Sequence, residues 1–599
     1  MSVSRPVAPA ALFVAFASVV GLGAADGGYF PSEWGLATLG FSLVGVTVLV
    51  LADVRAPDRR QLAFVGALAL AAGWAATSAL WSPGAGTPVL EAERGVLYVA
   101  TAAAAILLLA LPAAAPALLG GVVAGAVALS LYGLATRLFP GRVGGEYDPS
   151  GYQLAEPVGY ANALAIVAVV GILLALGLGA HGSVRVRVAC AMSLVVLLPT
   201  LYFTVSRGAV GALLAGLVAQ VVIDPNRRRL SIVFVSMGAP AGLAVLIASQ
   251  LPALTTQGAE LAAAQRDGSR FALFLVVLCL VAAAAAVFGE PSARRFSRDI
   301  DPRRYLLPAA VLVTLVVVPI ALIGASRSDG LVSLAGNGRG EWWRVAAEMV
   351  ADEPLLGTGA GSFEARFLRE GSPGLPARDA HNLYLETLAE VGPLGLLILL
   401  AAFAAPLTAI PRARHSAVGP AAASAFAAYL LQALVDWNWE IPVATVPALL
   451  CAAVLVAVAA EPDGRSLVGG RRALALAFAA PVLAVALIAH VGNRAVAASA
   501  DAATRDRAQL ALHEAKRAIA WAPWADEPWR LRGEAELLLE DDEAARQSFE
   551  RSLELNPESW AAWLDLAAVT EGERHSQALD RAERLNPVGV DAEEVHTEP

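Results

Sequence analysis

Three positions carry side chains suited to chemistry on a phosphate-bearing substrate. Arg207 lies in a Ser-Arg-Gly turn, Arg339 in a Gly-Arg-Gly segment, and His381 directly before Asn382. An arginine guanidinium is planar, stays ionised and can bind phosphate oxygens through two parallel hydrogen bonds. A histidine titrates near neutral pH and can take a proton from a hydroxyl group. The set therefore predicts anion binding combined with proton transfer.

Each of these residues also has a structural alternative. Arg207 could cap a membrane span and extend toward lipid headgroups. Arg339 could be a solvated loop residue, and His381 could cap a helix or belong to a core. The further candidate substrate contacts are Arg344, Asn382 and Asp436.

Two of these further candidates have structural alternatives as well. Arg344 could simply stabilise its own helix. Asp436 lies in the segment Asp436-Trp437-Asn438-Trp439-Glu440 and could be an ordinary interfacial residue among tryptophan anchors. His181 and His415 fall in predicted cytoplasmic loops, so we assign them no role.

The glycine-rich segment 357–361 resembles a dinucleotide-binding loop only superficially. It reads Gly-Thr-Gly-Ala-Gly, but no strand-helix-strand unit surrounds it. We therefore predict a tight turn after an amphipathic helix, without a nucleotide.

Composition indicates that most of these elements lie in a membrane. The chain has 599 residues, of which 57% are hydrophobic and 16% charged, and its mean hydropathy is +0.61. A soluble domain would have roughly a quarter charged residues. The pattern predicts an all-α, polytopic bundle of about 12–15 helices, each needing about 20 apolar residues. The predicted spans are 9–25, 34–53, 61–81, 95–112, 116–138, 158–180, 187–205, 208–223, 230–250, 270–289, 305–325, 384–409, 417–435, 442–460 and 473–491. The first could be a cleaved signal peptide, but we favour an uncleaved helix.

The charges of the connecting loops predict the orientation. Arginine-rich loops alternate with arginine-poor loops that contain acidic residues, among them Glu91 and Glu93. By the positive-inside rule the basic loops are cytoplasmic. This predicts a multi-pass protein of the cytoplasmic (inner) membrane with a long outer loop at 326–383 and an extracytoplasmic C-terminal tail.

An ordered series of short motifs resembles the O-antigen ligase and polymerase family of lipid-linked glycan transferases. The series comprises a Trp-Ser span end at 81–82, a Pro-x-Gly-Tyr-x-Asn segment at 157–162, and the Ser-Arg-Gly turn. It continues with an Arg-x-x-x-Trp helix start, a Pro-x-x-Gly-x-Gly turn and the His-Asn pair. The resemblance covers roughly residues 60–460. Gln153 departs from it, because many relatives have an arginine there.

The resemblance implies glycosyl transfer at the outer membrane face. The donor would be a glycan on undecaprenyl diphosphate and the acceptor a sugar hydroxyl of a glycan or glycolipid, with no metal, cofactor or nucleic acid. Arg207 and Arg339 would hold the diphosphate, and His381 would act close to the reacting centre. Such a site would stabilise the charge on the leaving oxygen.

The C-terminal segment has an internal repeat. Trp529 and Trp563 are 34 residues apart, as are Pro523 and Pro557, and the last unit is shorter by about four residues. This period resembles tetratricopeptide repeats, which stack pairs of helices. Because two or three units are marginally stable alone, we expect them to dock on the membrane domain or on a protein partner. They could instead be a simple helical appendage.

These observations predict four regions. They are a first set of spans (1–325), the outer loop (326–383), a second set of spans (384–491) and the repeat domain with an acidic tail (492–599). The favoured function is a membrane glycosyltransferase, either polymerase or ligase. The alternatives are a polysaccharide transporter or flippase, and a non-catalytic assembly protein. A transporter would be expected to have two related halves and ionisable residues at mid-membrane, and we see neither.

Overall fold

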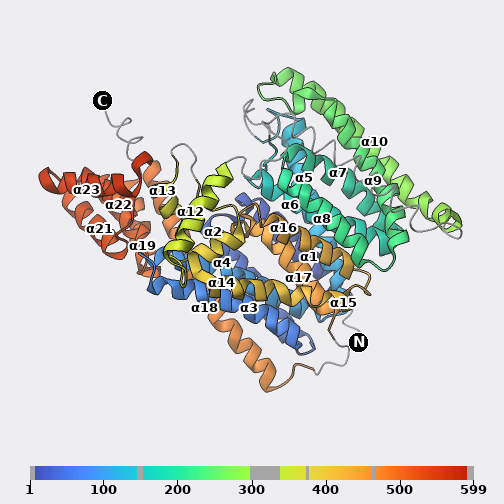
Figure 1. Cartoon of the computed structure of the whole chain (residues 1–599), viewed down its shortest axis with the longest axis horizontal. Coiled ribbons are helices and arrows are strands. Elements are labelled where there is room, and N and C mark those ends of the chain that lie inside the picture. Colours follow the sequence, from blue (N-terminus) through green and yellow to red (C-terminus); the bar gives the residue numbers. More distant parts are fainter. Residues whose placement is uncertain (1–6, 145–152, 297–337, 373–376, 461–465, 590–599) are drawn as a thin grey trace.

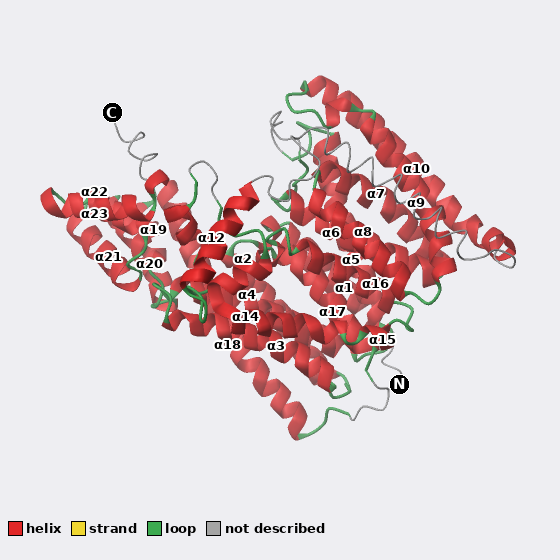
Figure 2. Ribbon diagram, viewed as in Figure 1, coloured by secondary structure: helices red, strands yellow, loops and turns green. Residues whose placement is uncertain are grey.

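The computed structural model describes residues 7–144, 153–296, 338–372, 377–460 and 466–589. These residues form a helical protein with one isolated β-bridge, between Arg55 and Ser466 (Figure 2). The prediction of an all-α bundle is confirmed.

Helices occupy fourteen of the fifteen predicted span positions, and the remaining one, 305–325, lies outside the described residues. Ten described helices are long and apolar enough to cross a membrane. The helices of the bundle are α1 (Val7–Gly23), α2 (Pro31–Leu51), α3 (Arg59–Thr77), α4 (Gly86–Leu109), α5 (Ala114–Leu138), α6 (Ala161–His181), α7 (Val184–Thr204), α8 (Arg207–Ile223), α9 (Arg227–Ser249), α10 (Leu261–Phe296), α14 (Leu383–Leu407), α15 (Ile410–Ala413), α16 (Gly419–Gln432), α17 (Pro442–Val458) and α18 (Gly470–Thr504).

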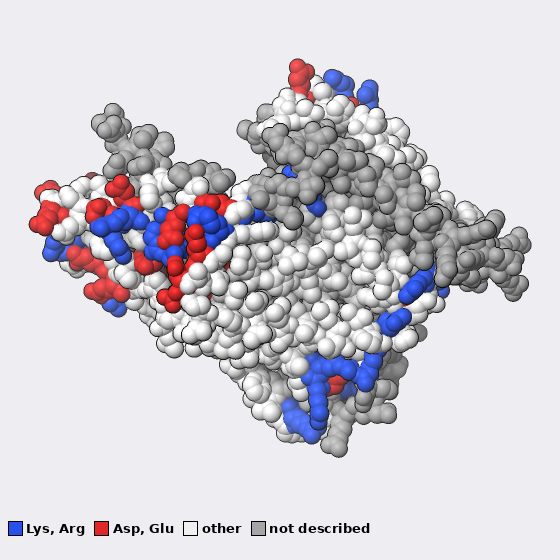
Figure 3. Space-filling model, viewed as in Figure 1, with Lys and Arg blue, Asp and Glu red and all other residues white. Residues whose placement is uncertain are grey.

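The centre of the bundle is formed by helices that are apolar on all sides. Helix α6 is buried along almost its whole length, and so is α17. A helix without a polar face has no surface suited to water, so burial among other helices is its stable position. In contrast, α3, α10 and α18 expose most of their apolar side chains. Figure 3 shows a broad uncharged surface between charged regions at the edges of the molecule, as expected for a surface that faces lipid.

Helix α14 is bent where the site begins. Gly392 has a φ of +69° and precedes Pro393, so the helix breaks between its first two turns and the long apolar part that follows. A Cβ atom at Gly392 would lie 2.4 Å from the carbonyl oxygen of Leu355. Only glycine fits this contact and this backbone conformation. The break sets the direction of the segment that carries Glu386 and Glu390.

The predicted outer loop contains two short helices, α12 (Arg339–Asp352) and α13 (Phe363–Glu370). They pack through a small apolar cluster that includes Trp342, Met349 and Phe363. Helix α12 also packs against α14. The position of Arg339 in the first turn of α12 is therefore fixed by contacts with the bundle.

Five helices follow the bundle: α19 (Ala508–Trp521), α20 (Glu527–Leu537), α21 (Asp542–Leu555), α22 (Trp560–Ala568) and α23 (Gly572–Leu585). Helices α19 and α21 begin 34 residues apart, at Ala508 and Asp542, which agrees with the expected period. Successive helices pack on one another at one end of the molecule (Figure 1). Membership of the tetratricopeptide family stays a prediction.

Three predicted spans have boundaries that differ clearly from the structure, and the first is the span expected at 270–289, which lies within the longer helix α10 (Leu261–Phe296). The span expected at 473–491 is part of the 35-residue helix α18, which continues through the predicted boundary at 491 and packs on α19. The alanine-rich residues after the span keep helical propensity in a polar environment. The span expected to start at 95 begins at Gly86, so Glu91 and Glu93 belong to helix α4 instead of a loop.

Candidate functional site

The candidate residues lie at the end of the bundle where α6, α8 and α14 begin, which we call the site end. His381 is in a left-handed backbone conformation, with a φ of +52°. The next residue, Asn382, caps α14, because its side-chain oxygen accepts hydrogen bonds from the backbone N–H groups of Tyr384 and Leu385. The cap fixes His381 immediately outside the helix.

The imidazole of His381 lies between two tryptophans. It stacks on Trp342 of α12, with ring centroids 4.1 Å apart, and its centroid is 5.7 Å from that of Trp437. The pKa of His381 is lowered to about 4, mainly by burial and also by the positive charge of nearby Arg339, while a hydrogen bond with the backbone of Asp379 raises it. The imidazole is therefore neutral at neutral pH, which is the form that can accept a proton.

Arg339 begins α12, three residues before Trp342. Its Nε atom and the indole Nε1 of Trp342 are buried and have no hydrogen-bond partner among the described residues. Unpartnered buried donors are uncommon in folded proteins and require an explanation. Two such donors beside one neutral imidazole form a site that could receive an anionic or hydroxyl-rich ligand.

Asp436 connects this cluster to α6. Its carboxylate accepts a hydrogen bond from the Tyr160 hydroxyl at 2.8 Å, and Tyr160 OH accepts one from Asn162 Nδ2 at 2.8 Å. Burial raises the pKa of Asp436, whereas the hydrogen bond from Tyr160 and the charge of Arg339 lower it. The Pro-x-Gly-Tyr-x-Asn segment therefore positions Asp436.

The other two arginines occupy different environments. Arg207 is exposed at the first position of α8, directly after the capping residue Ser206. A Cβ atom on Gly208 would lie 3.4 Å from Val435, so the start of α8 is adjacent to the segment carrying Asp436. The guanidinium group of Arg344 forms ion pairs with Glu341 at 2.7 Å and with Glu348 at 2.6 Å.

The structure thus brings His381, Arg339 and Asp436 together. Arg207 lies near them at the start of α8, adjacent to Val435. Asn382 acts as a helix cap and Arg344 is engaged by carboxylates. Their roles as substrate contacts stay predictions.

The glycine-rich segment 357–361 forms a turn, as predicted. The backbone N–H groups of Gly361 and Phe363 donate to the two carboxylate oxygens of Glu390, at 2.8 and 3.0 Å. Gly359 has a φ of +109°, and a Cβ atom there would lie 2.6 Å from Ser82. The turn joins α13 to α14 and to the Trp-Ser end of α3, so its glycines serve close packing.

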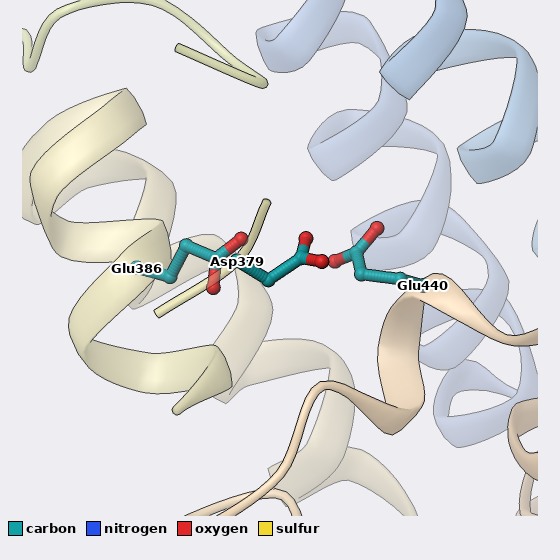
Figure 4. A group of neighbouring side chains, drawn as sticks. All are labelled: Asp379, Glu386 and Glu440. Carbon is teal, nitrogen blue, oxygen red and sulfur yellow. The ribbon is translucent and has the colours of Figure 1, made fainter. Parts of the chain in front are cut away.

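A buried group of charges lies next to this turn and was not predicted. Carboxyl oxygens of Asp379, Glu386 and Glu440 lie within 4.8 Å of one another, with the Asp379 carboxyl between the other two in Figure 4. Burial raises the pKa of Asp379 to about 7 and that of Glu440 well above its usual range. Arg94 of α4 forms ion pairs with Glu91 and Glu440.

The sequence offered only a weak signal for this group. Glu91, Glu93 and Arg94 are charged residues at the start of an apolar helix, and we interpreted the two acids as loop residues. Asp379, Glu386 and Glu440 come from separate segments, so no ligand-like spacing is visible in the sequence. The spacing of their oxygens could hold a cation, but the Arg94 guanidinium already neutralises part of the charge. Absence of a metal stays a prediction.

Residues 192–400 match the model of a family described as O-antigen ligase. This segment is therefore similar to O-antigen ligases. It extends from α7 into α14 and includes Arg207, Arg339 and His381, whereas Asp436 lies outside it. No curated protein matches the chain. The match and the apolar helices together indicate a multi-pass membrane protein that is similar to O-antigen ligases over residues 192–400.

Proposed function

We propose that this chain is a membrane glycosyltransferase that moves a glycan from undecaprenyl diphosphate to a sugar hydroxyl, at the outer face of the cytoplasmic membrane. The observation that supports this most directly is the pair of unpartnered buried donors, Arg339 Nε and Trp342 Nε1, beside the neutral imidazole of His381. A diphosphate oxygen can accept from the donors, and an acceptor hydroxyl can donate to the imidazole.

The two arginines have complementary roles in this proposal. Arg339 binds the diphosphate in the buried part of the site, and the exposed Arg207 binds it from the start of α8. The N-terminus of a helix carries a partial positive charge and free N–H groups, which favour an anion there. Together the two guanidinium groups stabilise the negative charge that develops on the leaving oxygen.

In the reaction, the acceptor hydroxyl attacks the anomeric carbon of the donor glycan. The new glycosidic C–O bond forms as the bond from that carbon to the diphosphate oxygen breaks, and undecaprenyl diphosphate leaves. His381 takes the hydroxyl proton. Tyr160 orients the carboxylate of Asp436, and the charge of Asp436 holds Arg339 in place. The hydroxyl-rich acceptor is expected to contact Trp437, since its ring is partly exposed beside His381.

Turnover of lipid-linked glycan by purified variants tests the proposal. We expect His381→Ala to lower kcat by about 10²–10⁴-fold, the usual contribution of a general base. Arg339→Lys should also lose activity, since lysine keeps the charge without the planar fork. Arg369→Ala is the matched control, because Arg369 is another loop arginine but pairs with Glu370 and Glu558.

The proposal fails if Arg339→Ala and His381→Ala both work at the wild-type rate while correctly inserted. If the wild-type chain moves lipid-linked glycan across the membrane without forming a glycosidic bond, the transporter alternative is correct.

A further inference from the structure

A buried arginine that the proposed reaction does not use lies directly behind the site. Arg94 of α4 is 4% exposed. It forms ion pairs with Glu91, one turn earlier on its own helix, and with Glu440 from the segment between α16 and α17. Its guanidinium also lies over the ring of Trp34, 5.4 Å from the centroid. A charge buried this deeply requires partners that stay in place.

Arg94 links α4 to the segment 436–440, and Glu440 of that segment lies beside carboxyl groups of the segment that carries His381. Glu440 ends the segment 436–440, and its carboxyl group is within 4.8 Å of those of Asp379 and Glu386 (Figure 4). Glu386 in turn accepts a hydrogen bond from the backbone N–H of Ala380 at 2.8 Å. One turn after Arg94, the hydroxyl of Tyr98 donates to the backbone carbonyl of Trp439.

The same two segments carry the candidate reacting groups. His381 is two residues after Asp379, and Trp437 is three residues before Glu440. The rings of His381 and Trp437 are 5.7 Å apart. A shift of one of these backbone segments relative to the other would therefore change both the distance between the Asp379 and Glu440 carboxyl groups and the distance between His381 and Asp436.

The charges in the cluster make Arg94 necessary for this arrangement. Asp379, Glu386 and Glu440 would repel one another if they were ionised, and Glu91 adds a further carboxylate beside them. Among the described residues, Arg94 is the cation that pairs with Glu440 and Glu91. Without it, burial and repulsion would both favour separation of the two segments.

We propose that Arg94 is a positioning residue of the site: by pairing with Glu440 at the centre of the carboxyl cluster, it sets the spacing between the segment that carries His381 and the segment that carries Asp436 and Trp437. The role in turnover rests on the proposed glycosyl transfer. The spacing itself does not, and it can be measured separately.

The activity test uses the full-length chain in proteoliposomes. The donor is the undecaprenyl-diphosphate-linked glycan extracted from cells that lack the chain, and release of undecaprenyl diphosphate is measured. We expect Arg94→Met to lower kcat by about 10²-fold, as for a small misplacement of reacting groups. The donor KM should change less than about threefold, because Arg207 and Arg339 are untouched. Arg94→Lys should be intermediate, since lysine cannot bind both carboxylates through a fork.

A second substitution separates positioning from general damage. Glu440→Gln removes the carboxylate that Arg94→Met leaves unpaired, so the double variant should regain about tenfold in kcat. Asp224→Asn is the matched control. Asp224 is equally buried and pairs with His181 at 2.8 Å, but the pair lies at the far end of α6, about 30 Å from the site end. It should keep the wild-type kcat.

The spacing is measured by electron spin resonance between labels on cysteines at Arg378 and Leu434, which are exposed residues close to the two segments. The partly exposed native Cys279 is replaced by Ala in all the labelled chains, so that only the two introduced cysteines are accessible to the label. We expect one narrow distance when Arg94 is present, a broader or longer one with Arg94→Met, and recovery in the double variant. An unchanged distance with Arg94→Met overturns the positioning role, even if the wild-type chain has no transferase activity. A folded Arg94→Met chain with wild-type kcat, a double variant no better than the single one, or an equal loss in Asp224→Asn would also overturn it.

Discussion

The pH below which activity is lost should be lower than it would be if the general base were a solvated histidine. His381 is buried between Trp342 and Trp437, and its pKa falls from 6.5 to about 4. This difference corresponds to about 3 kcal/mol of preference for the neutral imidazole. A general base works only when it is neutral, so activity is present above the pKa and lost as the pH falls through it. We expect kcat/KM for the donor, which reports the free protein, to be flat from pH 7 to about pH 5 and to fall tenfold per pH unit below about pH 4.

The limit for kcat should lie at a higher pH, because the donor brings negative charge to the imidazole. One net negative charge about 6 Å away, at an effective dielectric constant of about 20, contributes about 3 kcal/mol, or about two pH units. Bound diphosphate should therefore move the acid limb of kcat toward pH 6. Both phosphates of the donor are esterified, so the donor adds no titration of its own in this range.

The assay is initial-rate turnover in proteoliposomes from pH 3.5 to 8, with residual activity at pH 7 measured after each acid exposure. This control is needed because the unfolded chain takes up a proton on His381 first, so stability also falls as the pH drops from about 6.5 toward 4. A reversible decrease of kcat/KM that begins at pH 6.5 or above would refute the reasoning, since it would indicate a solvated general base. The same decrease in His381→Ala would show that another group titrates.

Four further predictions concern the rest of the chain. Removal of residues after Asp506 should preserve glycosidic bond formation, because α19–α23 contribute none of the candidate site residues; a fully inactive but folded truncation would contradict this. Cysteines at the exposed Ser372 and Ser576 should react with an impermeant thiol reagent in spheroplasts, whereas a cysteine at the exposed Ala417 should react only after lysis; the reverse pattern would invert the orientation. EDTA should leave turnover unchanged, and a loss restored by a divalent cation would assign one to the Asp379 cluster. Tyr160→Phe removes the 2.8 Å hydrogen bond to Asp436 and should cost about 1–2 kcal/mol in transition-state stabilisation, measured as a decrease of about 5–30-fold in kcat/KM; an unchanged rate would mean that Tyr160 does not act through Asp436.

Much of the fold could be predicted because lipid imposes a simple constraint on sequence. A spanning helix must be long and apolar, so apolar runs located fourteen of the described helices. The boundaries at α4 and α18 were wrong for a common reason. We ended the spans at charged residues, but Glu93 and Arg94 are helical and buried, and α18 continues beyond the apolar segment. Charge marks the edge of the hydrocarbon, whereas helices end according to their caps and propensities.

The candidate site could be predicted only where its residues lie at span ends. His381 and Asp436 lie next to apolar segments and Arg339 lies in the predicted outer loop, and the predicted topology brings all three to one face of the membrane. The carboxyl cluster around Arg94 depends instead on how α4, α14 and the segment 436–440 pack against one another. The pattern of charges in one helix cannot show that packing. The bend at Gly392 is equally necessary, because it directs Glu386 and Glu390 toward α4 and the glycine-rich turn.

The two faces of the site differ in how many of their hydrogen bonds are made, although Arg94 Nε, behind the site, is also buried without a partner among the described residues. This difference is consistent with a preorganised centre. On the face toward His381, Arg339 Nε and Trp342 Nε1 are buried without partners among the described residues. Each such donor costs about 1–3 kcal/mol until a ligand satisfies it. Behind it, the backbone N–H groups of the glycine-rich turn are bound by Glu390, and Arg94 is paired twice. These contacts behind the site can keep the unpartnered donors at fixed positions. In flexible loops, the same donors would turn toward water or toward each other. Fixed donors need no reorganisation when charge develops on a leaving oxygen, which is the condition under which they stabilise a transition state most effectively. The free-energy cost of leaving these donors unpaired in the free protein is then offset when the substrate binds. A variant that weakens the contacts of Arg94 or Glu390 should therefore lose turnover before the protein unfolds.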